Sequence, residues 1–268
     1  MLKSSNIPEQ LRPFVKKAVG MKEEEGGLRS TTGGLPPREV EFEWPRFQDR
    51  SLSLLATIYL SELPGIHDWL PAEGILLFFY DFESEPWGDD SEDYEGWRVV
   101  WNKEEPGSKE SCDKPADLDR GYVIKERPLK FQEVVTLPFD DHPLFEEVEL
   151  SEEEQEAWEE RFDDDEQWEE FDTGHIGGYS DAANGALYAF GCRELIDGGD
   201  PERAYRTSLE EIQEVESEMC LLLEYEMEER DDDEAPEIHS GRNFSFWAKM
   251  EDVLRHDFSK VWLRVERD

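Results

Sequence analysis

The chain has 268 residues, of which 69 are acidic and 28 are basic, so its formal net charge is -41. This charge argues against a nucleic-acid binder and against binding to an anionic membrane, because both need clustered Lys and Arg. The aromatic content of 12% is too high for a fully disordered acidic chain, so we expect a folded protein with acidic segments. No apolar run in the sequence reaches the roughly 18 residues of a transmembrane helix.

The N-terminus and the cysteines both favour the cytoplasm. The first charged residues are not followed by the apolar stretch of a secretory signal. The chain has an odd number of cysteines, Cys112, Cys192 and Cys220, and none of them form a C-x-x-C pair. We therefore do not expect a disulfide framework. The five histidines lie far apart in the sequence, without an H-x-x-x-H pattern. We therefore expect no zinc site and no cofactor.

The N-terminal segment is predicted to be a helix followed by a linker, which together span residues 1–32. Asn6 can cap a helix over residues 6–19, and Pro8 suits its first turn. Residues 22–39 are rich in Gly and Thr, which is typical of a loop.

Apolar runs separated by turn residues predict buried strands in the first half of the chain. The runs lie at residues 52–60, 74–80, 97–101 and 129–137. The second half has similar runs at residues 219–227, 243–247 and 261–265, with a short helix predicted at residues 249–255.

The segment from 146 to 172 differs sharply in composition from both halves, with sixteen Asp and Glu against one Arg. Ser151 and Glu154 have the spacing of a capping box, so we expect a helix to begin there. Ser208 and Glu211 have the same spacing and predict a second helix that extends to about residue 218.

The two halves of the chain resemble each other in the order of their elements. Gly33-Gly34 precedes a strand with a leucine pair and then an aromatic strand, and Gly177-Gly178 precedes the same succession. This similarity predicts an α+β fold, in which an internally duplicated unit with antiparallel sheets is packed into one body. We place the first half at residues 33–145, an acidic helical segment at 146–173 and the second half at 174–268.

Several sequence strings resemble a known family. The strings of the first half are GGLPPREVEFEWPR, SLSLLATIYLSEL and LPAEGILLFFYDFESEPWG, and those of the second half are GHIGGYSD, CLLLEYE and FSFWAKMEDVLRHDFSKVWLRVE. They are similar to the YwqG-like family of bacterial proteins of unknown function. The match runs from about residue 33 to residue 265. It implies an α+β body with antiparallel sheets and internal duplication, and no catalytic residues are carried over.

The resemblance identifies the chain as a divergent member of that family. Thr57 and Glu224 stand where the family has Gln in its two inner strands, and Ser180 stands where it has Pro. Ala183-Asn184 replaces an Ile-Gln pair. If these polar residues form a shared site in relatives, this chain has altered it.

Residues around the second Gly-Gly turn are candidates for a polar cleft. Within this group His175, Tyr179 and Asp181 are compact enough to hold a general base, although a hydrogen-bonded structural loop is the simpler interpretation. The glycines could present N–H groups to an anion, but tight turns are favoured because the surrounding acidity repels anions. The cleft candidates are Gly177, Gly178, His175, Tyr179 and Glu224.

The acidic segments are the candidates for partner binding. Aromatic side chains in an acidic field suit a basic protein surface, because the aromatics give affinity and the charge speeds association. The simpler alternatives are that the aromatics attach the segment to the domain and that the Asp runs are solvated. Neither Asp run has the D-x-D-x-D-G spacing of a calcium loop. The partner-binding candidates are Glu154, Trp158, Phe162, Asp163, Asp164, Asp165, Trp168, Asp231, Asp232 and Asp233.

These features favour a non-enzymatic acidic binding protein that engages a basic partner protein. The partner could be a nuclease toxin, which would make the chain an immunity or antitoxin-type inhibitor, or a nucleic-acid-binding protein, which would make it a DNA mimic. The alternative is an enzyme of unknown reaction with a polar cleft between the two halves. A third hypothesis, salt adaptation, predicts a more even spread of charge than the clusters at residues 146–172 and 224–237.

Overall fold

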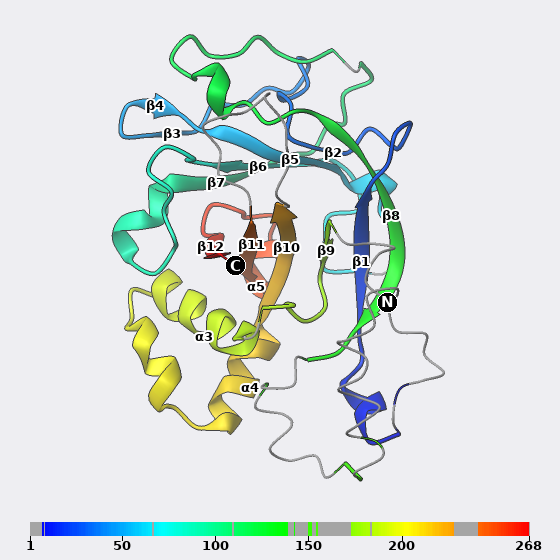
Figure 1. Cartoon of the computed structure of the whole chain (residues 1–268), viewed down its shortest axis with the longest axis vertical. Helices are drawn as coiled ribbons and strands as arrows, with labels where there is room; N and C mark the ends of the chain where they lie inside the picture. The colour runs from blue at the N-terminus through cyan, green and yellow to red at the C-terminus, as the bar shows by residue number, and fades with distance from the viewer. Residues whose placement is uncertain are drawn as a thin grey trace.

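The computed structural model shows a chain folded around one large β-sheet (Figure 1). It describes residues 7, 9–65, 67–108, 110–138, 142, 150–151, 154, 173–182, 184–227 and 241–267. Two of the acidic runs, at 155–172 and 228–240, lie outside these ranges.

Ten antiparallel strands form the sheet. They are β1 (Lys16–Glu23), β2 (Thr31–Thr32), β5 (Ser53–Tyr59), β6 (Ile75–Tyr80), β7 (Trp97–Asn102), β8 (Arg127–Thr136), β9 (Gly174–Ile176), β10 (Met219–Met227), β11 (Arg242–Lys249) and β12 (Trp262–Arg267). Their order in the sheet is β12-β11-β10-β9-β1-β8-β2-β5-β6-β7. The seven strands predicted from apolar runs are all confirmed, with bounds that differ by a few residues. A separate small hairpin contains β3 (Arg46–Phe47) and β4 (Arg50–Ser51).

The α+β class expected from the sequence is wrong, because the described chain is mainly sheet. Both halves contribute to one continuous sheet, since β1 and β8 pair in the middle and join the two groups of strands. In the part of the chain that the structure describes, the helices are few and short. The α-helices are α3 (Gly185–Ile196), α4 (Leu209–Glu218) and α5 (Met250–Leu254), and the 3-10 helices are η2 (Glu9–Phe14), η3 (Leu60–Glu62), η4 (Ser91–Gly96), η5 (Arg120–Tyr122) and η7 (Pro201–Arg206).

The N-terminal segment is the clearest difference from expectation. Instead of one helix over residues 6–19, the described part forms the short 3-10 helix η2 and then the central strand β1. Pro13 lies inside the last turn of η2, where it cannot continue an α-helix. Strand β1 pairs with β8 along its whole length and with β9 on its other side. This pairing outweighs the weak helical preference of the segment.

The two ends of the sheet match each other strand by strand. The order β2-β5-β6-β7 on one side corresponds to β9-β10-β11-β12 on the other. Thr31 of β2 is opposite Thr57 of β5, as His175 of β9 is opposite Glu224 of β10. The pairing shifts register between Leu54 and Ala56 in one half and between Leu221 and Leu223 in the other. The shared pattern means that a position in one half can be compared with its counterpart in the other.

The sheet curls until its two ends pack together, and β5, β6 and β7 lie above β10–β12 in Figure 1. Phe78 of β6 and Phe246 of β11, both fully buried, meet edge to face with ring centroids 5.0 Å apart. The Trp97 indole N–H on β7 donates to the Val261 carbonyl beside β12 at 2.9 Å. The hydrophobic core therefore lies between the two halves of one sheet.

The loop before η4 covers the edge strand β12. The Val265 N–H donates to the Trp87 carbonyl at 3.1 Å, and the Trp262 indole N–H donates to the Gly88 carbonyl at 2.9 Å. Gly88 has a φ of 75°, and a Cβ there would lie 1.7 Å from the Leu263 carbonyl oxygen. The close approach of this loop to β12 therefore requires glycine at position 88.

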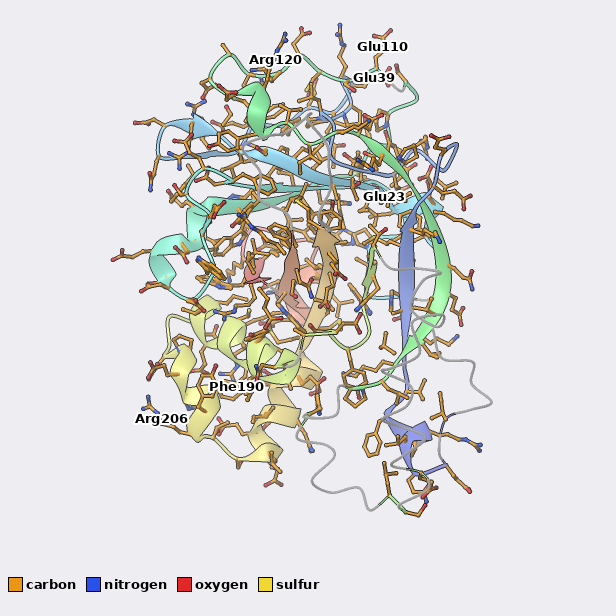
Figure 2. The ribbon with its side chains drawn as sticks, viewed as in Figure 1. Glu23, Glu39, Glu110, Arg120, Phe190 and Arg206 are labelled. Atoms are coloured by element: carbon orange, nitrogen blue, oxygen red, sulfur yellow. The ribbon has the colours of Figure 1, made fainter. Side chains whose placement is uncertain are left out.

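Helices α3 and α4 pack against each other, and α3 also contacts β11 and β12. Phe190 of α3, labelled in Figure 2, is fully buried in the core, whereas Arg206 at the end of η7 is exposed. Ser208 caps α4 by accepting the Glu211 N–H at 3.3 Å, which confirms the start predicted for this helix. Helix α3 was not predicted from the sequence.

Candidate functional site

The short strand β9 brings a buried histidine next to a buried glutamate. The register places His175 between Gly20 of β1 and Glu224 of β10. Gly174 makes this packing possible, because it has a φ of 140° and a Cβ there would lie 2.0 Å from the Glu224 carbonyl oxygen. The His175 and Glu224 residues are 5% and 2% exposed.

Asp181 completes a polar cluster with these two side chains. Its carboxylate Oδ2 lies 3.4 Å from His175 Nε2, and its backbone N–H donates to Glu224 Oε1 at 2.8 Å. One side-chain ligand atom from each of the three residues lies within 4.8 Å of the others. We call His175, Asp181 and Glu224 the β9–β10 cluster.

Two residues of β11 hold the Glu224 carboxylate in place. The Asn243 side-chain amide donates to Oε1 at 3.1 Å, and the Ser245 hydroxyl donates to Oε2 at 3.1 Å. Ser245 is directly opposite Glu224 in the register of β10 and β11. The carboxylate is therefore fixed by the neighbouring strand as well as by Asp181.

Two side chains of the β9–β10 cluster, His175 and Glu224, have strongly shifted pKa values. Burial disfavours the charged ring of His175, but the carboxylate of Asp181, with Glu224 and the Gly177 carbonyl, outweighs this and raises its pKa to about 9. Burial raises the pKa of Glu224, although the His175 ring opposes this effect. The carboxylates thus favour the charged ring of His175, whereas burial disfavours the charged form of Glu224.

The His175 ring is oriented through its second nitrogen. Its Nδ1 lies 2.8 Å from the Gly177 carbonyl, which can only accept, so Nδ1 carries the proton of this hydrogen bond. His67 covers the same turn, with Nε2 at 3.0 Å from the Ile176 carbonyl. Burial lowers the pKa of His67, and the His175 ring adds to the effect.

Tyr179, expected beside His175, makes its contacts elsewhere. Its N–H donates to the Thr136 hydroxyl at 2.9 Å, and the Lys16 ammonium lies 3.8 Å from the centre of its ring. The ring of His142 meets it edge to face at 5.5 Å. Burial raises the pKa of Tyr179, and the carboxylate of Glu216 adds to this effect. The contacts described for Tyr179 thus place it against β1 and β8 rather than in the β9–β10 cluster.

The glycines of the turns use their N–H groups within the fold. The Gly177 N–H donates to the Leu221 carbonyl at 2.8 Å, and the corresponding Gly33 N–H donates to Leu55 at 2.7 Å. Gly177 and Gly178 both have positive φ values, as expected for tight turns. The turn interpretation therefore accounts for these residues better than anion binding does.

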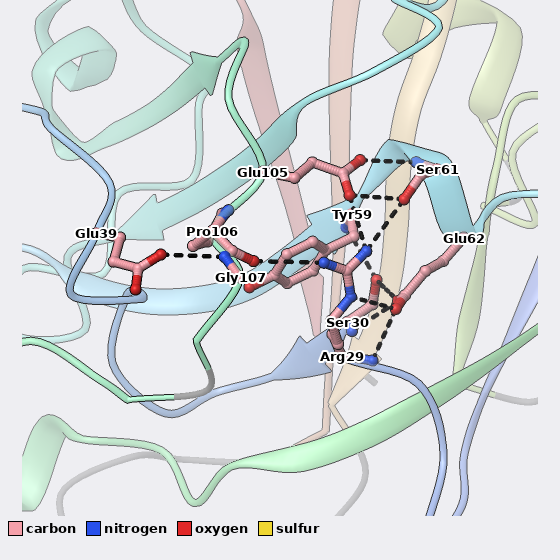
Figure 3. A network of polar contacts seen from close by, with 9 residues as sticks. All are labelled: Arg29, Ser30, Glu39, Tyr59, Ser61, Glu62, Glu105, Pro106 and Gly107. Carbon is pink, nitrogen blue, oxygen red and sulfur yellow. Dashed lines mark hydrogen bonds and ion pairs between the residues drawn. The ribbon is translucent and has the colours of Figure 1, made fainter.

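Beside the corresponding positions in the first half lies a different network, centred on Arg29 (Figure 3). Arg29 Nε donates to Glu62 at 3.0 Å and Nη2 donates to Glu105 at 2.8 Å, while the guanidinium lies 4.1 Å from the ring centre of Tyr59. Two carboxylates thus already neutralise this cation. The cavity beside it has a volume of about 70 Å³ and is lined in part by Thr31 and Thr57, so it is too small for a typical metabolite.

A second and wider hollow, of about 610 Å³, lies beside Gly34. Three of its lining side chains are basic, and none of the five cleft candidates lines either hollow. The basic residues that line it are Lys114, Arg120 and Lys125. Arg120 is labelled in Figure 2 near Glu110 and Glu39.

Most partner-binding candidates lie outside the described residues. These are Trp158, Phe162, Asp163, Asp164, Asp165, Trp168, Asp231, Asp232 and Asp233. Glu154 is described, and its carboxylate accepts both the N–H and the hydroxyl of Ser151, at 2.9 and 2.7 Å. The Glu154 N–H in turn donates to the Ser151 hydroxyl at 3.3 Å, so the predicted capping box is confirmed.

The fold and the site define an antiparallel β-protein in which a buried His-Glu pair, with the exposed Asp181 beside it, lies where β9 joins β10. A family model described as a domain of unknown function, DUF1963, matches residues 30–266, so the chain belongs to this family. A comparison with curated proteins finds no match. Among the described residues, no helix combines the length and apolar character needed to cross a bilayer.

Proposed function

We propose that this protein is a non-enzymatic acidic binding protein that engages a basic partner protein. The observation that supports this function most directly is the charge surplus. With 69 acidic and 28 basic residues, internal ion pairing leaves at least 41 carboxylates without a basic partner of their own in the chain. A basic surface is the complement that such a protein would recognise.

The ion pairs of the described residues strengthen this argument. Buried or half-buried cations such as Arg50, Arg242 and Arg264 already contact carboxylates. Exposed cations such as Arg38 and Arg206 do the same. The positive charge of the chain is therefore largely used inside the molecule, and an incoming basic protein would meet little repulsion.

The acidic segment at residues 146–173 is the proposed contact region. It combines clustered carboxylates with the aromatic residues Trp158, Phe162 and Trp168. The aromatic side chains would contribute binding affinity, and the carboxylates would speed association with the partner. An immunity or antitoxin-type inhibitor, or a DNA mimic, is the form of this function that we favour. We also propose that the protein is a member of the YwqG-like family and that it is located in the cytoplasm.

The test is affinity capture from native lysate at about 50 mM and about 500 mM salt, where the screening length falls from about 14 Å to about 4 Å. One stoichiometric basic protein, confirmed with the purified pair, is the expected result. The triple variant D163N/D164N/D165N should weaken the purified complex at least tenfold. A control triple, E39Q/E41Q/E43Q, removes the same charge from exposed positions and should have a much smaller effect. Equal losses of affinity for the partner in both variants would refute a specific contact region.

The alternative is an enzyme of unknown reaction, and the β9–β10 cluster is the observation that favours it. Enzymes often place paired titratable groups with shifted pKa values in a buried site, as His175 and Glu224 are placed here. Thermal stabilisation by a metabolite library, lost in the His175→Asn variant, would support this alternative. Retention of the same stabilisation in that variant would count against it.

A further inference from the structure

The buried ring of His175 is hydrogen-bonded through only one of its two nitrogens, as far as the described part of the chain shows. His175 is 5% exposed, and its Nε2 makes no hydrogen bond among the described residues. At 3.4 Å from Asp181 Oδ2, this nitrogen is in ion-pair contact but beyond good hydrogen-bond distance. Buried polar atoms in proteins nearly always have a hydrogen-bond partner or a ligand.

The second nitrogen of the ring has the partner that is typical of metal-bound histidine. Nδ1 donates to the Gly177 carbonyl at 2.8 Å, so Nε2 is the nitrogen that would bind a metal ion after it loses its proton. Glu224 is likewise held by Asn243 and Ser245, as ligating carboxylates usually are. The outer contacts of a metal site are therefore already present.

The distances also suit two ligands of one ion. Ligands at about 2.0–2.2 Å from a tetrahedral ion lie about 3.4 Å from each other. The separation between His175 Nε2 and Asp181 Oδ2 is 3.4 Å, and a Glu224 oxygen completes a set within 4.8 Å.

Charge balance points in the same direction. When a metal ion displaces the Nε2 proton, the neutral imidazole and two carboxylates carry a formal charge of −2, which one divalent cation cancels inside the protein. The acidic chain around the cluster also attracts cations, since its net charge is −41. Asp181, whose side chain is 46% exposed, provides a route of entry from solvent.

The other half of the sheet shows that these donors are not required by the backbone. Thr31 and Thr57 occupy the positions that correspond to His175 and Glu224, with the same strand pairing. The equivalent of Asp181, counted from the Gly-Gly turn, is Pro37. The fold forms with uncharged residues at all three positions, so the His-Asp-Glu set needs an explanation other than folding.

We propose that His175, Asp181 and Glu224 bind one divalent transition-metal ion of the Zn²⁺ or Mn²⁺ type, with water in the remaining positions. One nitrogen and two carboxylate ligands without sulfur suit these ions, whereas Ca²⁺ requires more oxygen ligands. This site is independent of the proposed partner surface, because it lies at the junction of β9 and β10 and not in the acidic segment.

The experiment is a Co²⁺ titration of the full chain, followed by visible absorption, in an excess of Mg²⁺ that occupies surface carboxylates. We expect one Co²⁺ per chain, visible d–d bands, and displacement by one equivalent of Zn²⁺. The Asp181→Asn variant should weaken binding at least tenfold. The control is Asp197→Asn, because Asp197 is also a carboxylate with 46% of its side chain exposed and an ion pair of its own.

Circular dichroism and the thermal midpoint of each variant show whether it folds. If Asp181→Asn is unstable, Glu224→Gln serves as the second variant, with the same expected loss of Co²⁺. Wild-type protein without d–d bands, or equal Co²⁺ affinity in Asp181→Asn and Asp197→Asn, would overturn the proposal. His175 would then be an imidazolium held between two carboxyl groups.

Discussion

Phe78 and Phe246 occupy corresponding positions on the two halves of the sheet and touch each other in the core. Phe78 is opposite Val99 in the pairing of β6 with β7, as Phe246 is opposite Leu263 in the pairing of β11 with β12. Their rings meet edge to face at 5.0 Å, and both residues are fully buried. The contact links strands that are seven places apart in the order of the sheet.

Replacement of Phe78 by Ala should lower the free energy of unfolding by about 3–5 kcal/mol, because a large buried ring leaves a cavity. Urea unfolding followed by tryptophan fluorescence measures this loss. The double variant with Phe246→Ala should lose less than the sum of the single losses, since both changes remove the same contact. Tyr205→Ala is the control, because Tyr205 is 70% exposed.

Replacement of Gly174 by Ala should destabilise the protein by about 2 kcal/mol or more. The φ of 140° is unsuited to a side chain, and the new Cβ would lie 2.0 Å from a backbone oxygen. Gly65→Ala is a matched control, since a Cβ there meets nothing within 4 Å. Similar thermal midpoints for the two variants would contradict the strained packing of β9 on β10.

Replacement of Glu62 by Gln should cost about 2–3 kcal/mol, because its carboxylate is a charged acceptor for several donors. These donors are the N–H and Nε of Arg29 and the N–H and hydroxyl of Ser30, at 2.8 to 3.0 Å (Figure 3). An amide can accept through one oxygen only. The exposed Glu104→Gln provides the control, and chemical unfolding of both variants supplies the comparison.

Glu216 should make stability depend on pH in the acid range. Burial opposes its ionisation, but His142 and Lys16 outweigh this and hold its pKa below the ordinary value of 4.5. A folded-state pKa below the unfolded one means that the contribution is complete above about pH 4.5. It is lost as the pH falls through the folded-state pKa.

The Glu216→Gln variant should therefore lose about 2 kcal/mol near neutral pH and approach the wild type at low pH. Thermal unfolding over a series of pH values measures this difference. Glu218→Gln removes a largely exposed carboxylate two residues away. This control should leave the pH dependence of the thermal midpoint in the acid range unchanged. Parallel curves for Glu216→Gln and the wild type would contradict the assignment.

The sequence predicts the strands well because their signal is local. Runs such as 53–59 and 75–80 are buried along their whole length and end at turn residues, so apolar composition alone marks them. Residues 16–19 of strand β1 were predicted as the end of a helix, because the alternation of β1 is weak and its partners β8 and β9 are distant in the chain. Helix α3 was missed because Gly185 and Gly191 lower its helical propensity.

The site was only partly accessible to sequence reasoning. His175 and Asp181 are close in the chain, so their grouping was recognised, and Glu224 was noted because it replaces Gln. What brings Glu224 to His175 is the pairing of β9 with β10, across almost fifty residues. Asn243 and Ser245 carry no local signal at all, because their role depends on the register of β11 against β10.

The loop at Trp87 and Gly88 has a consequence for behaviour at high concentration. An open edge strand offers unpaired N–H and C=O groups to which a second molecule can add a strand, and this is a common start of aggregation. The Val265 N–H on β12 is already bonded to Trp87, and Gly88 lies too close to Leu263 for another backbone to enter. The chain thus shields one end of its own sheet from strand addition by its copies.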